Sequence, residues 1–157
     1  MIRFMKKEDK KKVMDIIHST GMFTDAEIVV AEELIDRFLD VPEQKDYQVV
    51  VIEDGRHNVV GYLCYGPTDL TEGVYDIYWT AVSPECQGDG FGRAMFDWLE
   101  NTIGAEKGRM IIIETSSQPK YQPTRQFYLN SDCREVARIP DFYKPGDDRV
   151  IYIKRFN

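Results

Sequence analysis

The sequence predicts a mixed α/β fold in which helices cover both faces of a central sheet. Short apolar runs of strand length alternate with segments of helical periodicity along the chain. The run at residues 110–114 is dominated by apolar residues, as expected of a strand covered on both faces. The chain has 157 residues, 43% of them apolar, and no repeat or linker. We therefore expect one domain over residues 1–157 with a sizeable core.

The first part of the chain is predicted to form one strand and two helices. Residues 2–5 have the composition of a short strand, and residues 8–19 carry apolar side chains at helical spacing. Thr24 is followed three positions later by Glu27, which is a capping-box pattern that begins a second helix. That helix is expected to end before Pro42, because proline cannot continue a helix.

Three strands are predicted next. Residues 47–53 and 59–65 are apolar runs separated by Asp54-Gly55 and Asn58, which is the signal of a hairpin. Residues 74–82 form an aromatic-rich run that we also interpret as a strand.

The remaining elements follow in the same alternation, which gives the order β-α-α-β-β-β-α-β-α-β-β. They are a helix from residue 91, a strand at 110–114, a short helix at 123–131 with Pro123 in its first turn, and a hairpin of residues 134–139 and 150–154 across Pro145-Gly146. We expect about seven strands in a mixed sheet.

Charge and cysteine content limit the classes of partner. Twenty-seven acidic against twenty basic residues give a net charge of −7, which disfavours nucleic acid and weakly favours a cationic substrate such as an amine. Cys64, Cys86 and Cys133 are too widely spaced for a metal cluster or a disulfide framework, so we expect reduced thiols and no metal. No run reaches membrane-spanning length and none resembles a signal peptide. We therefore expect a cytoplasmic protein without a membrane partner.

A glycine-rich loop between the strand at 74–82 and the next helix is the strongest functional signal. Gly88, Gly90 and Gly92 alternate there, so main-chain N–H groups can turn toward one point. The helix that follows adds its own free N–H donors, which makes the loop a predicted site for a phosphorylated ligand. The spacing excludes a P-loop and the dinucleotide fingerprint.

The pattern Gln87-x-x-Gly90-x-Gly92 resembles the signature of the GNAT acetyltransferase superfamily. Phe127-Tyr128, on the short helix after the fifth strand, resembles a second landmark of that family, and the order of elements is similar from end to end. The resemblance implies a GNAT fold with a mostly antiparallel sheet. It also implies an N-acetyltransferase that moves an acetyl group from acetyl-CoA to a primary amine by direct attack in a ternary complex.

The same resemblance implies the cofactor contacts. The pyrophosphate of acetyl-CoA would lie on the loop, and pantetheine would lie beside the main chain of the preceding strand, where the fourth and fifth strands splay apart after a bulge. The residues concerned are Ala81, Val82, Gln87, Gly88, Asp89, Gly90, Phe91, Gly92 and Arg93. Tyr121 replaces a common asparagine of the family, and Thr124 or Arg125 could substitute for it. Asp89 departs from the usual basic residue, which suggests that its side chain points outward. Asp132-Cys133 replace Gly-Phe, and an aspartate can still adopt a left-handed turn.

Two side chains are candidates for catalysis. Tyr128 matches the family tyrosine that protonates the leaving thiolate, although an aromatic residue there could also be part of the core. Asp76 lies where some members place a catalytic carboxylate, and partial burial would raise its pKa. An exposed aspartate at the start of a strand is an equally good interpretation, and a chain of water molecules is the alternative base.

The acceptor is not identified by the sequence. A small-molecule amine is favoured over a peptide or protein amine, and a longer acyl donor stays open. Candidate pocket residues are Met22, Phe23, Tyr62, Tyr75, Tyr78, Trp79 and the segment Asp141-Phe142-Tyr143. The alternative is a non-catalytic acyl-CoA-binding or regulatory module of the same fold. The resemblance also suggests a homodimer, because dimers are frequent in the family.

Overall fold

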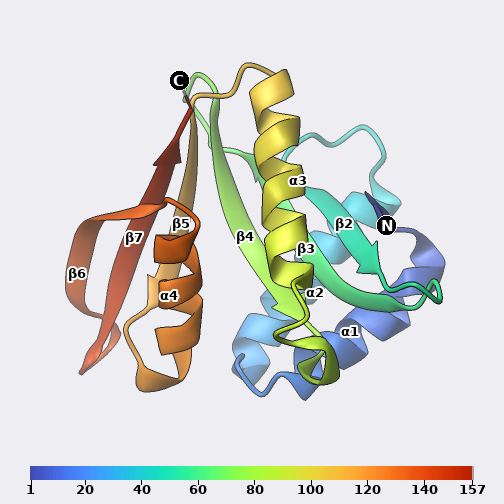
Figure 1. The fold of residues 1–157 in the computed structure, drawn as a ribbon, viewed down its shortest axis with the longest axis horizontal. Helices are drawn as coiled ribbons and strands as arrows, with labels where there is room; N and C mark the ends of the chain where they lie inside the picture. The colour runs from blue at the N-terminus through green and yellow to red at the C-terminus, as the bar shows by residue number, and fades with distance from the viewer. Residues whose placement is uncertain (157) are drawn as a thin grey trace.

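The computed structural model describes residues 1–156 and confirms the predicted order of elements (Figure 1). The helices and strands are β1 (Ile2–Phe4), α1 (Lys10–Ser19), α2 (Asp25–Asp40), β2 (Gln48–Glu53), β3 (Val59–Pro67), β4 (Val74–Val82), α3 (Phe91–Ala105), β5 (Met110–Ser116), α4 (Gln122–Asn130), β6 (Arg134–Lys144) and β7 (Asp147–Arg155). Three 3-10 turns precede helices or loops, at η1 (Lys7–Asp9), η2 (Pro84–Cys86) and η3 (Pro119–Tyr121).

All seven strands belong to one sheet in the order β1-β2-β3-β4-β5-β7-β6. Among the described residues only β4 and β5 pair in parallel, and every other neighbouring pair is antiparallel. The mixed, mostly antiparallel sheet is therefore confirmed. The parallel pair requires a crossover connection, and α3 supplies it.

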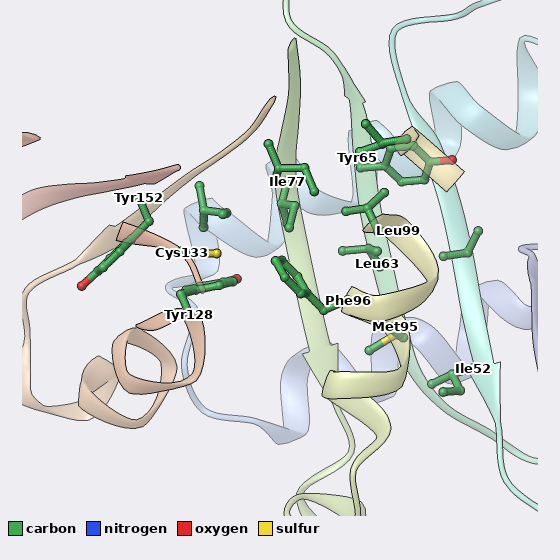
Figure 2. Packing of buried hydrophobic residues seen from close by; sticks show 14 of the residues in the cluster. Ile52, Leu63, Tyr65, Ile77, Met95, Phe96, Leu99, Tyr128, Cys133 and Tyr152 are labelled. Carbon is green, nitrogen blue, oxygen red and sulfur yellow. The ribbon is translucent and has the colours of Figure 1, made fainter. Parts of the chain in front are cut away.

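Each face of the sheet has its own hydrophobic core, because successive side chains of a strand point to opposite faces. Val50 and Ile52 of β2 belong to the core beneath α3 and α4, while Val49 and Val51 belong to the core beneath α1 and α2. Figure 2 shows the first core, in which Leu99 of α3 has no exposed surface. Helices therefore cover both faces of the sheet, as predicted.

Local signals in the sequence are satisfied in the structure. The Glu27 N–H donates to Thr24 Oγ1 at 3.2 Å and the Thr24 N–H donates to Glu27 Oε1 at 3.1 Å, so the capping box begins α2. At the end of α4, Asp132 adopts a left-handed conformation with φ of 60°. The turn expected from its position is thus formed without glycine.

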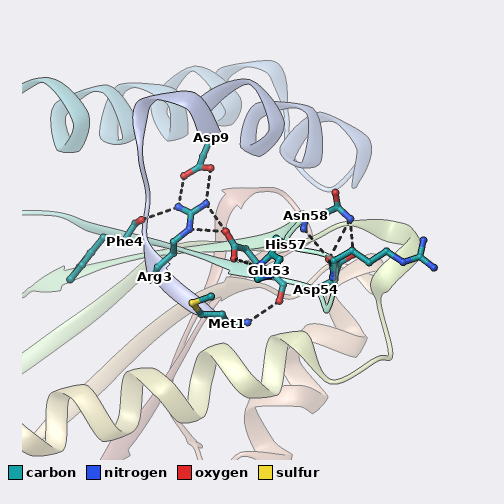
Figure 3. A network of polar contacts seen from close by, with 9 residues as sticks. Met1, Arg3, Phe4, Asp9, Glu53, Asp54, His57 and Asn58 are labelled. Carbon is teal, nitrogen blue, oxygen red and sulfur yellow. Dashed lines mark hydrogen bonds and ion pairs between the residues drawn. The ribbon is translucent and has the colours of Figure 1, made fainter.

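The amino-terminal strand is fixed to the sheet by charged groups (Figure 3). The Arg3 guanidinium donates to Asp9 at 2.7 and 3.0 Å and to Glu53 at 2.7 Å. These contacts hold the pKa of Asp9 below its usual value. The terminal amino group of Met1 also donates to the Glu53 carbonyl at 3.0 Å. The cluster joins β1, η1 and β2 and so holds the amino-terminal strand in the sheet.

Two expectations need correction. The strand at 110–114 is covered on one face only, because Ile111 and Ile113 are buried whereas Ile112 is half-buried and Glu114 is exposed. An apolar run indicates burial but does not say whether both faces are covered. The last hairpin is also longer than predicted: β6 extends to Lys144 and β7 begins at Asp147, so the strands reach the Pro145-Gly146 turn itself.

Candidate functional site

The parallel pair β4–β5 separates part of the way along its length (Figure 1). The pairing runs from Val74 opposite Met110 to Ile77 opposite Ile113 and goes no further within the described residues. On the other side of β4 the register with β3 shifts, because Cys64 lies opposite Trp79 while Tyr65 lies opposite Ile77. Tyr78 is the extra residue of this β-bulge, which bends the strand.

The splay leaves one edge of β4 unpaired beyond the bulge. Residues 79–82 still pair with β3 but, within the described residues, have no partner strand on the β5 side. An unpaired edge offers N–H and C=O groups to an extended ligand, which can be added as a further strand. Ala81 and Val82 lie on this edge, as the sequence prediction requires.

The glycine loop follows directly at the end of the free edge. Gly88 and Gly90 have φ of 87° and 89°, a conformation that L-residues adopt only with strain. Gly90 is the N-cap of α3, and it offers no side chain to cap the helix. Within residues 1–156, no protein acceptor takes the N–H groups of Gly88, Gly90, Phe91, Gly92 and Arg93. Five free amides at a helix N-terminus favour an anion.

The side chains of the loop add little positive charge. Gln87 Nε2 donates to the Val82 carbonyl at 3.2 Å and so ties the loop to the end of β4. Arg93 Nε donates to Asp97 at 2.7 Å along the helix. The Asp89 side chain is exposed, as expected. The donors that Gln87–Arg93 offers to an anion are therefore mainly main-chain N–H groups.

Tyr128 projects from α4 into the core between α4 and α3 (Figure 2). Its side chain is 4% exposed, and its ring lies 6.2 Å from Phe96 and 6.1 Å from Tyr152. The hydroxyl makes no hydrogen bond within residues 1–156, yet it is not among the fully buried unpaired polar atoms, so it keeps some access to solvent. In Figure 2 it points toward Phe96 and Ile77, on the side of β4. Burial raises the pKa of Tyr128 above the usual value for tyrosine.

Asp76 is half-buried on the face of the sheet opposite to Ile77. Its carboxylate accepts a hydrogen bond from Thr68 Oγ1 at 2.5 Å. Burial raises the pKa of Asp76, the Thr68 hydroxyl opposes that shift, and Glu114 adds to it. An exposed position at the strand end does not describe this residue. The carboxylate lies one residue before the point where β4 and β5 part.

Thr124 and Arg125 lie at the opposite wall of the splay. Arg125 Nη1 donates to the carbonyls of Ser116 at 2.8 Å and Gln118 at 2.9 Å, so it holds the connection between β5 and α4. Thr124 is half-buried and makes no side-chain hydrogen bond within residues 1–156. Of the two predicted substitutes for the asparagine, Thr124 has the free polar group.

Two connections meet at the open end of the splay. The Met22 carbonyl, between α1 and α2, accepts from Lys120 Nζ at 2.9 Å and from the Tyr121 hydroxyl at 3.0 Å. Phe23 packs edge-on against Trp79 of β4 with ring centroids 5.4 Å apart. The loop that follows α1 therefore closes one side of the splay, and the candidate positions Met22, Phe23 and Trp79 lie in these contacts.

The other aromatic candidates divide into two groups. Tyr62 has no exposed surface within the core under α1 and α2, and Tyr75 packs in the opposite core and donates to Glu106 at 2.9 Å. These two residues do not line the open face. Tyr78, Phe142 and Tyr143 are exposed to solvent. A sequence shows the aromatic residues of a strand but does not distinguish those that are covered by helices.

Sequence reasoning did not single out three residues that contribute to this face. Thr68 bonds Asp76 across the β3–β4 hairpin. Glu114 forms an ion pair with Arg149, and the Arg149 guanidinium lies 4.7 Å from the centroid of the Phe142 ring. Glu114 did interrupt an apolar run, which could have indicated it. The contact between Glu114 and Arg149 depends on the β5–β7 register, which the sequence does not specify.

The cysteines are not arranged for nucleophilic chemistry. Burial raises the pKa of Cys64 to about 12 and that of Cys133 to about 11. Desolvation, together with the carboxylates of Glu85 and Asp89, raises the pKa of Cys86 beside the glycine loop. Within the described residues, the His, Cys, Asp and Glu side chains form no group of three suited to a metal, and no helix is long and apolar enough to cross a bilayer.

These features define a class of protein in which the free edge of a strand, at the splay of a parallel pair, leads to free amides at a helix N-terminus. Residues 45–131 match the family described as "Acetyltransferase (GNAT) domain", which is more than half of the chain. The chain belongs to the GNAT acetyltransferase family.

Individual relatives agree with this assignment. A solved structure from Desulfovibrio desulfuricans, assigned to the same family, is 39% identical with a TM-score of 0.92 and covers 99% of this chain and 98% of its own. A protein of Methanocaldococcus jannaschii named as an uncharacterized N-acetyltransferase is 33% identical over 103 residues, which are 65% of this chain and 62% of that protein. An aminoglycoside 6'-N-acetyltransferase complexed with coenzyme A shares the fold, with a TM-score of 0.74 at 14% identity.

Proposed function

We propose that this chain is an N-acetyltransferase that moves an acetyl group from acetyl-CoA to a primary amine by direct attack in a ternary complex. The observation that supports it best is the continuity of the free β4 edge with the five free amides around Gly90. A free strand edge that ends at free amides suits a ligand that is extended at one end and doubly anionic at the other. Membership of the family and the neighbour complexed with coenzyme A support the same ligand.

In this proposal the main chain binds the cofactor. Pantetheine lies along Ala81 and Val82 as an added strand, and the pyrophosphate accepts hydrogen bonds from the loop at Gln87–Arg93. A main-chain N–H near the bulge polarises the thioester carbonyl. The exposed Asp89 carboxylate gives no help to a diphosphate, so it should slightly oppose binding.

The reaction forms one bond and breaks one. The amine nitrogen attacks the thioester carbonyl carbon, the new C–N bond forms, and the C–S bond breaks. Asp76, or water held near it, takes the proton that the amine loses. The sulfur leaves as a thiolate and receives a proton from the Tyr128 hydroxyl. Solvent then restores both groups, and the products are the N-acetyl amine and free CoA.

The raised pKa of Tyr128 limits how far its proton can move to the leaving thiolate. The phenol stays protonated at neutral pH, so the donor is always present. A thiol has an ordinary pKa of about 8.5, below that of tyrosine, so complete proton transfer to the thiolate is uphill. Tyr128 should therefore act first as a hydrogen-bond donor to the developing thiolate. We expect its loss to slow transfer on the order of 100-fold, at the low end of general acid catalysis.

The direct test is release of CoA thiol when the protein is incubated with acetyl-CoA and a panel of amines. Acetyl-CoA alone should raise the melting temperature, because it binds the folded state only. Tyr128→Phe should lower kcat and leave that thermal shift intact. Tyr152→Phe is the matched control, because it removes a hydroxyl from the same core that points away from β4 in Figure 2. Equal rates for both variants would remove Tyr128 from the acid role.

The rival is a module that binds acyl-CoA without transferring the acyl group. The observation in its favour is the buried Tyr128, whose hydroxyl has no hydrogen-bond partner within residues 1–156. A thermal shift with acetyl-CoA and no thiol release with any amine would support this module. Thiol release that depends on one amine would reject it. The preference for a small-molecule acceptor, the cytoplasmic location and a homodimer stay predictions.

A further inference from the structure

The end of β6 and the turn into β7 form an irregular segment, residues 140–146, to which we refer as the arm. Asp141 has φ of 54°, a left-handed value that costs about 1 kcal/mol or more for a residue with a side chain. Its carboxylate accepts from the Gly146 N–H at 2.7 Å, and its own N–H donates to Asp148 at 3.0 Å. The Asp148 N–H donates in turn to Ser117 Oγ at 2.7 Å. These bonds hold the arm against the end of β5.

The arm presents two adjacent aromatic rings to solvent. Phe142 is 48% exposed and Tyr143 is 49% exposed, and their rings meet edge-on at 5.1 Å. The Arg149 guanidinium covers one face of Phe142 at 4.7 Å, so the exposed part of that ring is its remaining surface. The strained residue and the hydrogen bonds of this turn hold the two exposed rings in fixed positions. Local backbone strain often occurs at functional positions.

The arm lies close to the point where β4 and β5 part. Glu114 is the first β5 residue beyond the last β4–β5 pair, and it forms an ion pair with Arg149, on which Phe142 rests. Burial raises the pKa of Tyr143, and carboxylates from two other segments, Glu114 and Glu27, add to the shift. Tyr143 contacts Phe142, whose ring lies on the Arg149 guanidinium that pairs with Glu114, so the arm lies beside β5 just beyond its last pair with β4.

The charged groups at the open end of the splay also bear on which acceptor can bind. Glu114 is neutralised by Arg149, and within residues 1–156 Asp76 has a hydrogen bond from Thr68 but no ion-pair partner. Asp76 therefore offers a carboxylate without an ion-pair partner, and Arg149, which favours its charged form, links it to the aromatic surface of Phe142. An ammonium group suits the carboxylate, and a flat apolar group suits the rings of Phe142 and Tyr143.

We propose that Asp76 and the arm select the acceptor, and that this acceptor is a primary amine with one positive charge and an aromatic ring. The proposal rests on the proposed function, since it identifies the substrate class of that same site. The ammonium lies at Asp76, and the ring packs against Phe142 and Tyr143. A second ammonium group would find Glu114 already paired.

The test compares kcat/KM for three amines of similar reactivity: 2-phenylethylamine, ethanolamine and 1,4-diaminobutane. We expect 2-phenylethylamine to be the best acceptor. Phe142→Ala should lower its kcat/KM about tenfold through KM, which is the scale of one lost aromatic contact. The same variant should leave ethanolamine unchanged. Val136→Ala is the control, because Val136 is a similarly exposed apolar residue on β6 outside the arm. Phe142→Leu should restore part of the loss.

Two readouts separate failure of this proposal from failure of the proposed function. Binding of 2-phenylethylamine to the protein without acetyl-CoA, measured by calorimetry, does not need transfer. If Phe142→Ala weakens that binding but no amine releases thiol, the result supports the proposed acceptor site and rejects the proposed acetyltransferase activity. If thiol is released fastest with the diamine or with a peptide amine, or if Phe142→Ala changes all acceptors equally, the acceptor proposal is wrong and the transferase stands.

Discussion

Two glycines of α3 give a test of the anion site in which only the backbone differs. Gly90 is the N-cap of the helix with φ of 89° and ψ of 3°, whereas Gly104 lies in its last turn, one residue before its end, with a helical backbone. A Cβ atom built on either residue meets no other atom within 4 Å. Replacing either glycine by alanine therefore creates no clash. The two variants should differ through conformational preference alone.

The expected effects have opposite signs. Alanine at Gly90 must take a left-handed conformation, which costs about 1–2 kcal/mol. Alanine at Gly104 gains about 0.5–1 kcal/mol, because glycine weakens a helix interior. About 2–4 °C in melting temperature corresponds to 1 kcal/mol in a chain of this size. Gly90→Ala should then melt about 2–8 °C lower than the natural chain, and Gly104→Ala about 1–4 °C higher.

Calorimetry with and without acetyl-CoA extends the test to function. Gly90→Ala displaces the N–H groups that we assign to the pyrophosphate, so the rise in melting temperature caused by acetyl-CoA should become smaller. Gly104→Ala lies at the other end of α3 and should keep the full shift. A Gly90→Ala protein as stable as the Gly104→Ala protein would contradict the left-handed cap. A destabilised Gly90→Ala protein that keeps the whole shift would place the pyrophosphate elsewhere.

Three further substitutions test other parts of the structure by urea unfolding. Asp76→Asn should raise the unfolding midpoint at pH 7, because burial raises the pKa of Asp76 and the ionised form therefore destabilises the fold. The natural chain should gain stability as pH falls through that pKa, and the unfolding midpoints of the two proteins should become equal below pH about 3.9. A difference in midpoint that stays constant with pH would contradict this. Ser116→Ala removes the 2.5 Å hydrogen bond to the buried Asp147 and should cost about 1–3 kcal/mol at neutral pH. The pKa of Asp147 is lowered, so this loss of stability should fade only in acid, where the Asp147 carboxylate becomes protonated. An unchanged stability of Ser116→Ala at neutral pH would refute this role of the hydrogen bond. Leu99→Ala empties a fully buried site beneath α3 and should cost about 2–5 kcal/mol, and a loss within the range of surface substitutions would refute the packing.

The sequence predicted those parts of the fold that depend on local interactions. The capping box at Thr24 and the glycine loop at Gly88–Gly92 involve residues a few positions apart, and their chemistry is specific to the motif. The Asp54 hairpin is of the same kind, since its N–H donates to the Asn58 carbonyl at 3.0 Å. In each case the backbone geometry follows from side chains near in sequence.

Features that depend on distant segments were missed or only half predicted. The open face of β5 could not be foreseen, because an apolar run carries no information on whether a helix covers each face. The Glu114–Arg149 pair joins residues 35 positions apart through the β5–β7 register. The Tyr128 ring packs in the core against Phe96, while its hydroxyl makes no hydrogen bond within residues 1–156. A role in the core and a role as proton donor are therefore compatible, which the sequence alone does not show.

The topology explains why the two halves of the site differ in kind. A parallel pair joined by a crossover helix brings the end of β4 and the start of α3 to the same edge of the sheet. The free strand edge and the free helix amides are therefore consequences of the connection, and they need glycine more than any particular side chain. The acceptor end instead depends on side chains from the β3–β4 hairpin, β5 and the arm, which the topology does not constrain. Substitutions at Phe142 or Glu114 can change the acceptor without disturbing the loop at Gly90. It follows that family membership predicts the donor well, whereas only the side chains at Asp76 and the arm can predict the acceptor.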